Sequence, residues 1–318
     1  MPAIATLAMN PAIDVSVAVD RIESGAKLRC RSDARDPGGG GINVARVIRR
    51  LGADAVAVYP AGGAMGDLLQ HLVAREGVAS VAVPISGETR EDFTVLEEES
   101  GQQYRFVLPG AHLQGREWMA CLKALSNLPV RPNVICASGS LPPGTPDDFY
   151  ARVAEIASGW GARFVLDASG PALKAALDAH VYLIKPNLAE MRELAGRALD
   201  DEASLIQACR GLIAQRRVEA VALTLGANGA LLVTAQSAWR ARAPSVEPVS
   251  TFGAGDSFLG AMVWAQASGK PLREAFRYGV AGGTAAVRAA GTELAHAAET
   301  HRLLAQVAVE EITNQPVT

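Results

Sequence analysis

A single carboxylate, Asp256, lies among small residues in the stretch STFGAGDSFLGAM, residues 250–262. The apolar residues that follow have helical spacing, so a helix is expected to begin near Asp256. Its first turn would present unpaired N–H groups and the positive dipole end, and Gly253, Ala254 and Gly255 would leave that backbone accessible. Such N–H groups can stabilise a phosphoryl group in transfer while Asp256 takes the proton of an attacking hydroxyl. The alternative is an acid that only caps the helix.

A run of four glycines occurs in DPGGGGINVARVIRRLG, residues 36–52, and an amphipathic helix follows it. The segment matches neither the Walker P-loop nor G-x-G-x-x-G. A flexible loop is one interpretation. A glycine run at a helix N-terminus favours another, in which the backbone approaches a polar ligand closely and Asn43 gives a directional hydrogen bond.

Two further segments have both a structural and a functional interpretation. In KPNLAEM, residues 185–191, Lys185 is one of only five lysines, and Asn187 and Glu190 fit a capping box as well as a water-mediated Mg²⁺ site. TLGANGALL, residues 224–232, indicates a hairpin and could also bring backbone against a nucleotide. These segments alone leave both alternatives open.

The elements that must position these residues alternate between buried strands and amphipathic helices. Strands are expected within 133–140, 162–170, 181–187 and 220–229, each ending in small or polar residues. This alternation predicts an α/β fold with a mostly parallel sheet flanked by helices, whose ligands bind at the carboxyl ends of the strands.

Two segments depart from this pattern, residues 14–36 and 88–107, which alternate with period two. Phe93 and Val95 followed by Tyr104 and Phe106 predict a hairpin. We expect one domain over 1–318 with a small β-sheet lid from these segments, the alternative being a solvated hairpin without function. Residues 310–318 are expected to form a frayed tail.

Composition excludes several classes of protein. The chain has 318 residues, 49% of them hydrophobic, and a formal net charge of −3, so no basic field points to nucleic acid or to an anionic membrane. Its four cysteines form no C-x-x-C pair, which argues against a zinc site or a disulfide framework and fits a reducing compartment. There is no signal-peptide pattern and no apolar run of the ~18 residues that a membrane span needs. We expect a cytoplasmic protein.

Together these motifs resemble the ribokinase/PfkB family of carbohydrate kinases over nearly the whole chain, from NPAID near the start to AGGTAAV near residue 287. STFGAGDSF is similar to the C-terminal signature of the family, and PGGGGINVAR to its N-terminal signature. GAKLRC, YPAGGAMG, GQQYRFVLPG and SGSLPPG add similarity to the members that phosphorylate fructose 6-phosphate. The resemblance implies a ribokinase-like fold with a lid that often serves as the interface of a homodimer.

The resemblance also implies MgATP as donor, fructose 6-phosphate as acceptor at its C1 hydroxyl, and a role for individual residues. Asp256 resembles the general base, and Gly253, Ala254 and Gly255 the anion hole. The positions that resemble the sugar site are Asp14, Gly39 and Asn43 for the hydroxyls and Lys27, Arg90, Arg105 and Ser140 for the phosphate. Those that resemble the nucleotide site are Lys185, Asn187, Thr224, Gly226 and Gly229, with Glu190 completing an Asn-x-x-Glu motif for Mg²⁺ bound through water. Family members often hold K⁺ on main-chain carbonyls, which here implies Ser250, Phe252, Ala286, Ala289 and Gly291.

Three alternatives remain at this stage. Kinases of fructose 1-phosphate and of tagatose 6-phosphate resemble this chain too, but they commonly have a lysine inside the glycine run, where this chain has Gly40 and Gly41. A sugar-phosphate sensor without catalysis is the alternative from another class. Such a protein would be expected to lose the base or the anion hole, and both are present.

Overall fold

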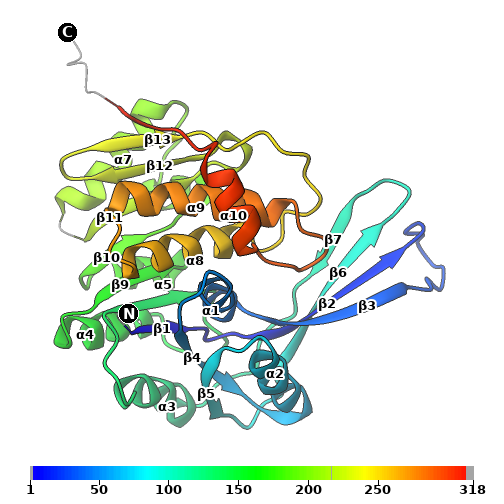
Figure 1. Ribbon diagram of the computed structural model, residues 1–318. Coiled ribbons are helices and arrows are strands. Elements are labelled where there is room, and N and C mark those ends of the chain that lie inside the picture. The colour runs from blue at the N-terminus through cyan, green and yellow to red at the C-terminus, as the bar shows by residue number, and fades with distance from the viewer. Residues whose placement is uncertain (1–2, 216, 313–318) are drawn as a thin grey trace.

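The central layer of the computed structural model, which describes residues 3–215 and 217–312, is a large twisted sheet (Figure 1). Within these residues it has ten strands in the order β14-β13-β12-β11-β10-β9-β8-β1-β4-β5. Neighbours from β11 to β5 pair in parallel, and β12, β13 and β14 extend the sheet in antiparallel fashion. The strands are β1 (Ile4–Leu7), β4 (Ala55–Ala61), β5 (Ala79–Pro84), β8 (Val134–Ser138), β9 (Arg163–Asp167), β10 (Val181–Ile184), β11 (Val218–Thr224), β12 (Ala230–Thr234), β13 (Ala238–Ala241) and β14 (Val309–Glu311).

Helices cover both faces of this sheet, and each face has its own hydrophobic core. Alternate residues of one strand enter opposite cores, as Cys136 and Ile135 of β8 do, so the parallel strands are buried on both sides. One core packs against α1 (Gly40–Arg50), α2 (Gly63–Arg75), α8 (Ala254–Ala267), α9 (Leu272–Val287) and α10 (Ala297–Leu304). The other packs against α3 (Gly115–Ser126), α4 (Phe149–Gly159), α5 (Gly170–Ala176), α6 (Leu188–Ala195) and α7 (Glu202–Ala214), and a 3-10 turn, η1 (Gly226–Asn228), joins β11 to β12. The predicted α/β fold is confirmed.

A second, smaller sheet projects from one side of this body (Figure 1). Its order is β3-β2-β6-β7, formed by β2 (Ala12–Val19), β3 (Arg31–Gly38), β6 (Arg90–Glu97) and β7 (Gln103–Phe106). Phe93 pairs with Phe106 and Val95 with Tyr104, which confirms the predicted hairpin. The sheet coincides with the segments expected to form a lid, and its action as a lid stays a prediction.

Helices α1 and α8 lie unusually close, and Gly260 permits this. A Cβ added at Gly260 would lie 2.8 Å from Val47 Cβ and 3.1 Å from the Val44 carbonyl oxygen. Gly260 is one helical turn after Asp256, and Val44 follows Asn43. The close packing therefore sets the distance between the two side chains from which the candidate site is built.

Two further expectations concern the C-terminal tail and a membrane span. The expectation of a tail at 310–318 is wrong for Glu310 and Glu311, which pair with Arg240 and Trp239 as part of β14; residues 313–318 lie outside the described residues. Of the helices in the described residues, none is both long and apolar enough to cross a bilayer.

Candidate active site

Asp256 lies in the first turn of α8, and its carboxylate points to residues of other elements. Gly253 is the N-cap with φ 63°, and a Cβ there would lie 2.3 Å from Leu294 Cδ2. Asn43 Nδ2 donates to Asp256 Oδ2 at 2.9 Å, and Ser138 Oγ lies 3.4 Å from Oδ1. These hydrogen bonds connect Asp256 to α1 and β8, so the role of this acid is not limited to capping α8.

The electrostatic surroundings of Asp256 favour its neutral form. Burial raises the pKa of Asp256 to about 6; the hydrogen bond from Asn43 opposes the shift, and the negative charge of Asp167 adds to it. A carboxyl group with a pKa near physiological pH is suited to exchange a proton with a substrate.

The glycine run brings the N-terminus of α1 against three other parts of the site. A Cβ at Gly38 would lie 2.2 Å from Asp14 Oδ2, one at Gly40 would lie 2.2 Å from Ser138 Oγ, and one at Gly41 would lie 2.2 Å from the Leu7 carbonyl oxygen. Gly39, the N-cap, has φ 106°, which favours glycine. The run was expected to admit a ligand, and the contacts that it makes in this structure are with Asp14, Ser138 and Leu7.

Asp14 is the second acid of the site. It lies on β2, is 4% exposed, and burial raises its pKa to about 7, with the negative charge of Asp92 adding to the shift. The positive charges of Arg105 and Arg46 act in the opposite direction. Asp14 and Asp256 are close enough to repel each other electrostatically, so the structure brings these two predicted residues together.

The four residues expected around a sugar phosphate have different placements. Arg105 stacks on Phe252, with its guanidinium carbon 4.8 Å from the ring centroid. Arg90 donates to the carbonyl oxygens of Asn10 and Leu108, while Ser140 Oγ accepts from Asn10 Nδ2 at 3.1 Å. Asn10 therefore joins Arg90 to Ser140. Lys27 is exposed between β2 and β3. Within residues 3–215 and 217–312, no hydrogen bond, ion pair or ring contact joins its side chain to Arg90, Arg105 or Ser140.

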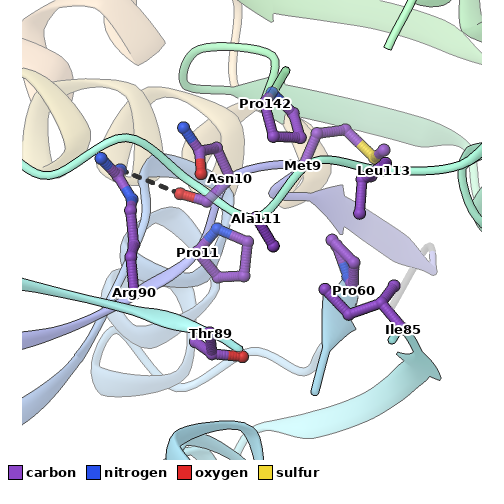
Figure 2. A pocket seen from close by; sticks show the side chains of 10 residues that line it. All are labelled: Met9, Asn10, Pro11, Pro60, Ile85, Thr89, Arg90, Ala111, Leu113 and Pro142. Atoms are coloured by element: carbon purple, nitrogen blue, oxygen red, sulfur yellow. Dashed lines mark hydrogen bonds between the residues drawn. The ribbon is translucent and has the colours of Figure 1, made fainter. Parts of the chain in front are cut away.

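A small pocket adjoins Arg90 and Asn10 (Figure 2). Its wall is mostly apolar, and Arg90 donates to the Asn10 carbonyl oxygen at its edge. The lining residues are Met9, Asn10, Pro11, Pro60, Ile85, Thr89, Arg90, Ala111, Leu113 and Pro142. Arg90 and Asn10 thus lie at the edge of a mostly apolar wall.

Lys185 joins the nucleotide side of the predicted site to Asp256. It follows β10, is 6% exposed, and its Nζ lies 3.2 Å from Asp167 Oδ1. Burial lowers the pKa of Lys185 and the carboxylate of Asp167 raises it; the net pKa is raised, so the amine stays charged. A Cβ at Gly255 would lie 3.4 Å from this Nζ, so the cation lies directly beside the first turn of α8.

The remaining nucleotide candidates lie at the ends of β10 and β11. Asn187 and Thr224 form an isolated parallel β-bridge, in which the Thr224 amide donates to the Pro186 carbonyl oxygen. Gly226 opens η1 with φ 59°, and Gly229, with φ 84°, follows it. Asn187 and Glu190 form the expected capping box, with distances of 2.8 and 2.9 Å. The predicted hairpin of β11 and β12 is confirmed.

Glu190 and Asp167 form a pair of acids that suits a hard cation. Burial raises the pKa of Glu190, and the negative charge of Asp167 adds to this. In the described part of the chain no three His, Cys, Asp or Glu side chains are placed to hold a metal alone. Magnesium usually keeps several waters and binds through one or two carboxylates plus substrate phosphates. The two acids fit Mg²⁺ in that mode.

The five residues proposed for K⁺ come from two segments that the structure places side by side. The amides of Val249 and Ser250 donate to the Val287 carbonyl oxygen, and Ser250 Oγ donates to the Gly291 carbonyl oxygen at 2.9 Å. The carbonyl oxygen of Ala286 accepts from the amide of Ala289 at the C-terminal end of α9. Main-chain carbonyl oxygens suit an alkali cation. Phe252 lies between Ser250 and Gly253, the N-cap of α8.

Sequence reasoning missed two residues of this cluster, Ser138 and Asp167. Ser138 Oγ lies 3.3 Å from Asp167 Oδ2 and so joins Asp167 to Asp256. Each is the last residue of its strand, β8 or β9. Their position at the carboxyl end of parallel strands was the available signal.

The fold and this arrangement of an acid at a helix N-terminus define a kinase class, and the comparisons with known proteins agree. Residues 6–298 match the model of the pfkB family carbohydrate kinases. The chain belongs to this family, and it is therefore a phosphotransferase with an alcohol group as acceptor.

Individual relatives cover almost the whole chain. An "ATP-dependent 6-phosphofructokinase isozyme 2" of Mycobacterium tuberculosis is 40% identical over 92% of this chain and 86% of its own. A 1-phosphofructokinase of Xanthomonas campestris is 35% identical over 80% of this chain and 81% of its own.

Solved structures of phosphofructokinase-2 from Escherichia coli agree with the fold. Its complex with potassium superposes with a TM-score of 0.92 at 37% identity and covers 96% of this chain and 99% of its own. Its complex with fructose-6-phosphate has a TM-score of 0.90 at 36% identity and the same coverage.

The raised pKa of Asp256 predicts that this carboxyl destabilises the folded protein at neutral pH. Its pKa lies above the unfolded value of 3.8, so stability falls as pH rises through about 4 to 6. Asp256→Asn should therefore raise the free energy of unfolding by about 1–3 kcal/mol at pH 8, and by less at pH 5. Urea unfolding followed by circular dichroism measures both values. The control is Asp54→Asn at an exposed acid; a gain for Asp256→Asn that is equal at both pH values contradicts the prediction.

Proposed function

We propose that this chain transfers the γ-phosphoryl group of MgATP to the C1 hydroxyl of fructose 6-phosphate, giving fructose 1,6-bisphosphate and ADP. The observation that carries this proposal is the buried Asp256 carboxyl, hydrogen-bonded to Asn43 and placed in the first turn of α8. The M. tuberculosis and E. coli relatives, both named as ATP-dependent 6-phosphofructokinase isozyme 2, and the E. coli structure in complex with fructose-6-phosphate support the choice of sugar.

In the proposed reaction Asp256 takes the proton of the C1 hydroxyl as that oxygen attacks the γ-phosphorus. A bond forms between the C1 oxygen and phosphorus, and the bond from phosphorus to the oxygen of ADP breaks. The amides of the Gly253–Gly255 turn face the moving phosphoryl group, and the charged amine of Lys185 lies beside them. Bound Mg²⁺ would neutralise charge on the phosphate oxygens.

Binding of the two substrates is assigned to opposite sides of Asp256. Asp14, Gly39 and Asn43 would hold sugar hydroxyls, and Arg90, Arg105, Ser140 and Lys27 its phosphate, because arginine forks match phosphate oxygens. Asn187, Thr224, Gly226 and Gly229 would contact the nucleotide at the ends of β10 and β11, and Glu190 with Asp167 would hold Mg²⁺ through water.

Fructose 1-phosphate is the second candidate acceptor, because the X. campestris relative is a 1-phosphofructokinase. The presence of Gly40 and Gly41 in place of a lysine favours fructose 6-phosphate. A side chain at either position would meet Ser138 Oγ or the Leu7 carbonyl oxygen at 2.2 Å, so the present backbone leaves no room for the lysine that the competing kinases commonly have.

We expect the highest kcat/KM with fructose 6-phosphate among fructose 6-phosphate, fructose 1-phosphate and tagatose 6-phosphate. Asp256→Asn should lower kcat at least ~100-fold, because a general base contributes that much or more. ADP release from MgATP measures both. Preference for fructose 1-phosphate would replace the substrate and keep the mechanism. Binding of all three sugars without turnover would contradict catalysis and favour a sensor.

A weakened Mg²⁺ site and the removal of K⁺ should each lower turnover. Glu190→Gln should raise the Mg²⁺ concentration for half-maximal activity on the order of 10-fold, as loss of an outer ligand partner does. Glu193→Gln, at an exposed acid one turn further along α6, is the control for Glu190→Gln. An unchanged Mg²⁺ requirement in Glu190→Gln would remove Glu190 from the site.

Replacement of KCl by choline chloride at constant ionic strength should lower kcat if Ser250, Phe252, Ala286, Ala289 and Gly291 hold K⁺.

We further propose a homodimer formed through the second sheet, acting in the cytoplasm. Leu28, Phe106, Val107 and Leu108 expose apolar surface on or beside this sheet, which favours contact with a second copy. The four cysteines are described as free thiols, which fits a reducing compartment.

Sedimentation velocity should give twice the chain mass of 33.2 kDa. Phe106→Asp should produce monomer, because a buried unpaired charge opposes association. Met119→Asp, at an exposed apolar residue of α3, should leave the dimer intact. A wild-type monomer at micromolar concentration would contradict this interface.

A further inference from the structure

Helix α1 contains a buried arginine, Arg46, one turn after Asn43. Its side chain is 1% exposed, although an arginine is rarely buried without partners. One terminal nitrogen donates to Asn43 Oδ1 at 3.2 Å and to the Pro37 carbonyl oxygen at 3.0 Å. The other pairs with Glu76 at 3.1 Å and with Asp36 at 3.5 Å. The guanidinium thus joins α2 and β3 to Asn43.

The amide of Asn43 has two different ends, and Arg46 distinguishes between them. A guanidinium only donates hydrogen bonds, so it requires the oxygen of the amide on its side. The nitrogen must then point the other way, where Nδ2 donates to Asp256 Oδ2 at 2.9 Å. A reversed amide would place its oxygen against the carboxylate and its N–H groups against the guanidinium, and both contacts would be repulsive.

We propose that Arg46 is a positioning residue for Asp256, because it holds the Asn43 amide in the orientation that donates to this carboxylate. This proposal rests on the proposed function of Asp256 as general base, and it extends the site to a residue that contacts neither substrate. Without Arg46 the amide could turn, and Asp256 would lose the hydrogen bond that favours its charged form.

The guanidinium is itself fixed from the side away from the site. Glu76, at the end of α2, also accepts from Arg50, and Asp36 Oδ2 accepts from Thr292 Oγ1 at 2.6 Å. Thr292 in turn accepts from Ser16 Oγ on β2 at 3.1 Å. Because these side chains belong to five segments, namely α1, the end of α2, β2, β3 and the loop that contains Thr292, Arg46 is held in place before any ligand binds, as a supporting residue of a site must be.

Other charged groups around Asp256 do not replace this hydrogen bond. The titratable groups that interact electrostatically with it are Asp14 of β2, Cys136 of β8, Asp167 at the end of β9 and Lys185 after β10. Burial and Asp167 favour the neutral acid, and the donor from Asn43 is the largest opposing effect. Loss of that donor should therefore shift the titration of Asp256 to higher pH.

The test compares Arg46→Lys with Arg50→Lys in the full chain. Lysine at position 46 keeps a cation for Glu76 and Asp36 but lacks the second nitrogen that reaches Asn43. Arg50 lies one turn further along α1, pairs with the same Glu76 and donates to the Leu294 carbonyl oxygen instead. We expect the acid limb of kcat for Arg46→Lys to move up by about one pH unit, with about 5–10-fold lower kcat at pH 5.5 and KM values within about 3-fold. Arg50→Lys should keep the wild-type limb.

A double variant tests the route of the effect. If Arg46 acts through Asn43, Arg46→Lys should add no further shift in the Asn43→Ala background. An additive shift, or an unmoved limb in Arg46→Lys while Asn43→Ala moves it, would overturn the proposal. If Arg46→Lys does not fold, Arg46→Met with Glu76→Met removes the whole buried pair, and the same shift is expected.

One measurement separates this proposal from the proposed function. Carbon-13 NMR of the labelled Asp256 carboxyl in the ligand-free protein gives its pKa without catalysis. A higher value in Arg46→Lys than in wild type supports the positioning role even if fructose 6-phosphate is not the substrate. An unchanged value overturns it, whatever the turnover assays give.

Discussion

The hydrogen bond between Asn43 and Asp256 is the contact on which the rest of the candidate site depends. It joins residues 213 apart in sequence, and it exists only because α1 and α8 begin at the same edge of the sheet and pack closely. Gly260 permits the close packing, and the glycine run holds α1 against β8 and Asp14. A methyl group at Gly260 would push α8 away from α1, and one at Gly38, Gly40 or Gly41 would push the N-terminus of α1 away from Asp14, Ser138 or Leu7. The small residues therefore act first on the geometry of the protein itself, and through it on the ligands.

The second constraint is an excess of negative charge. Asp167, Asp256 and Glu190 lie around one buried amine, Lys185, and Asp14 interacts with Asp256; burial raises the pKa of both Asp14 and Asp256. Such a cluster destabilises the folded chain at neutral pH, as sites that await cationic or proton-donating ligands commonly do. A bound Mg²⁺ ion would supply positive charge, and the hydroxyls of a sugar would supply protons. The cost in stability and the capacity for phosphoryl transfer thus arise from the same residues.

Much of the fold and part of the candidate site could be predicted from sequence, because both leave local patterns. Strand and helix periodicity indicated the α/β body, and period-two alternation indicated the hairpin of β6 and β7. The acid in the first turn of α8 was visible as one carboxylate among small residues. Ser138, Asp167 and Arg46 were missed because their roles arise from neighbours in space: two end parallel strands, and the third lies inside an ordinary amphipathic helix. The β14 strand was missed because an edge strand depends on pairing with β13, which no local pattern shows.

The second sheet meets the body at the turn that precedes α8. Ser250 Oγ lies 3.2 Å from Gln103 Oε1, Arg105 stacks on Phe252, and Ser16 donates to Thr292, so strands β2 and β7 contact the segments proposed for K⁺. Phe252 is decisive here, because a smaller residue would offer no ring to the guanidinium. Arg105, which would bind the sugar phosphate, is thus held by Phe252, directly before the Gly253–Gly255 turn that would stabilise the moving phosphoryl group. The second sheet and this turn are thus joined through contacts of side chains that lie 147 residues apart in sequence.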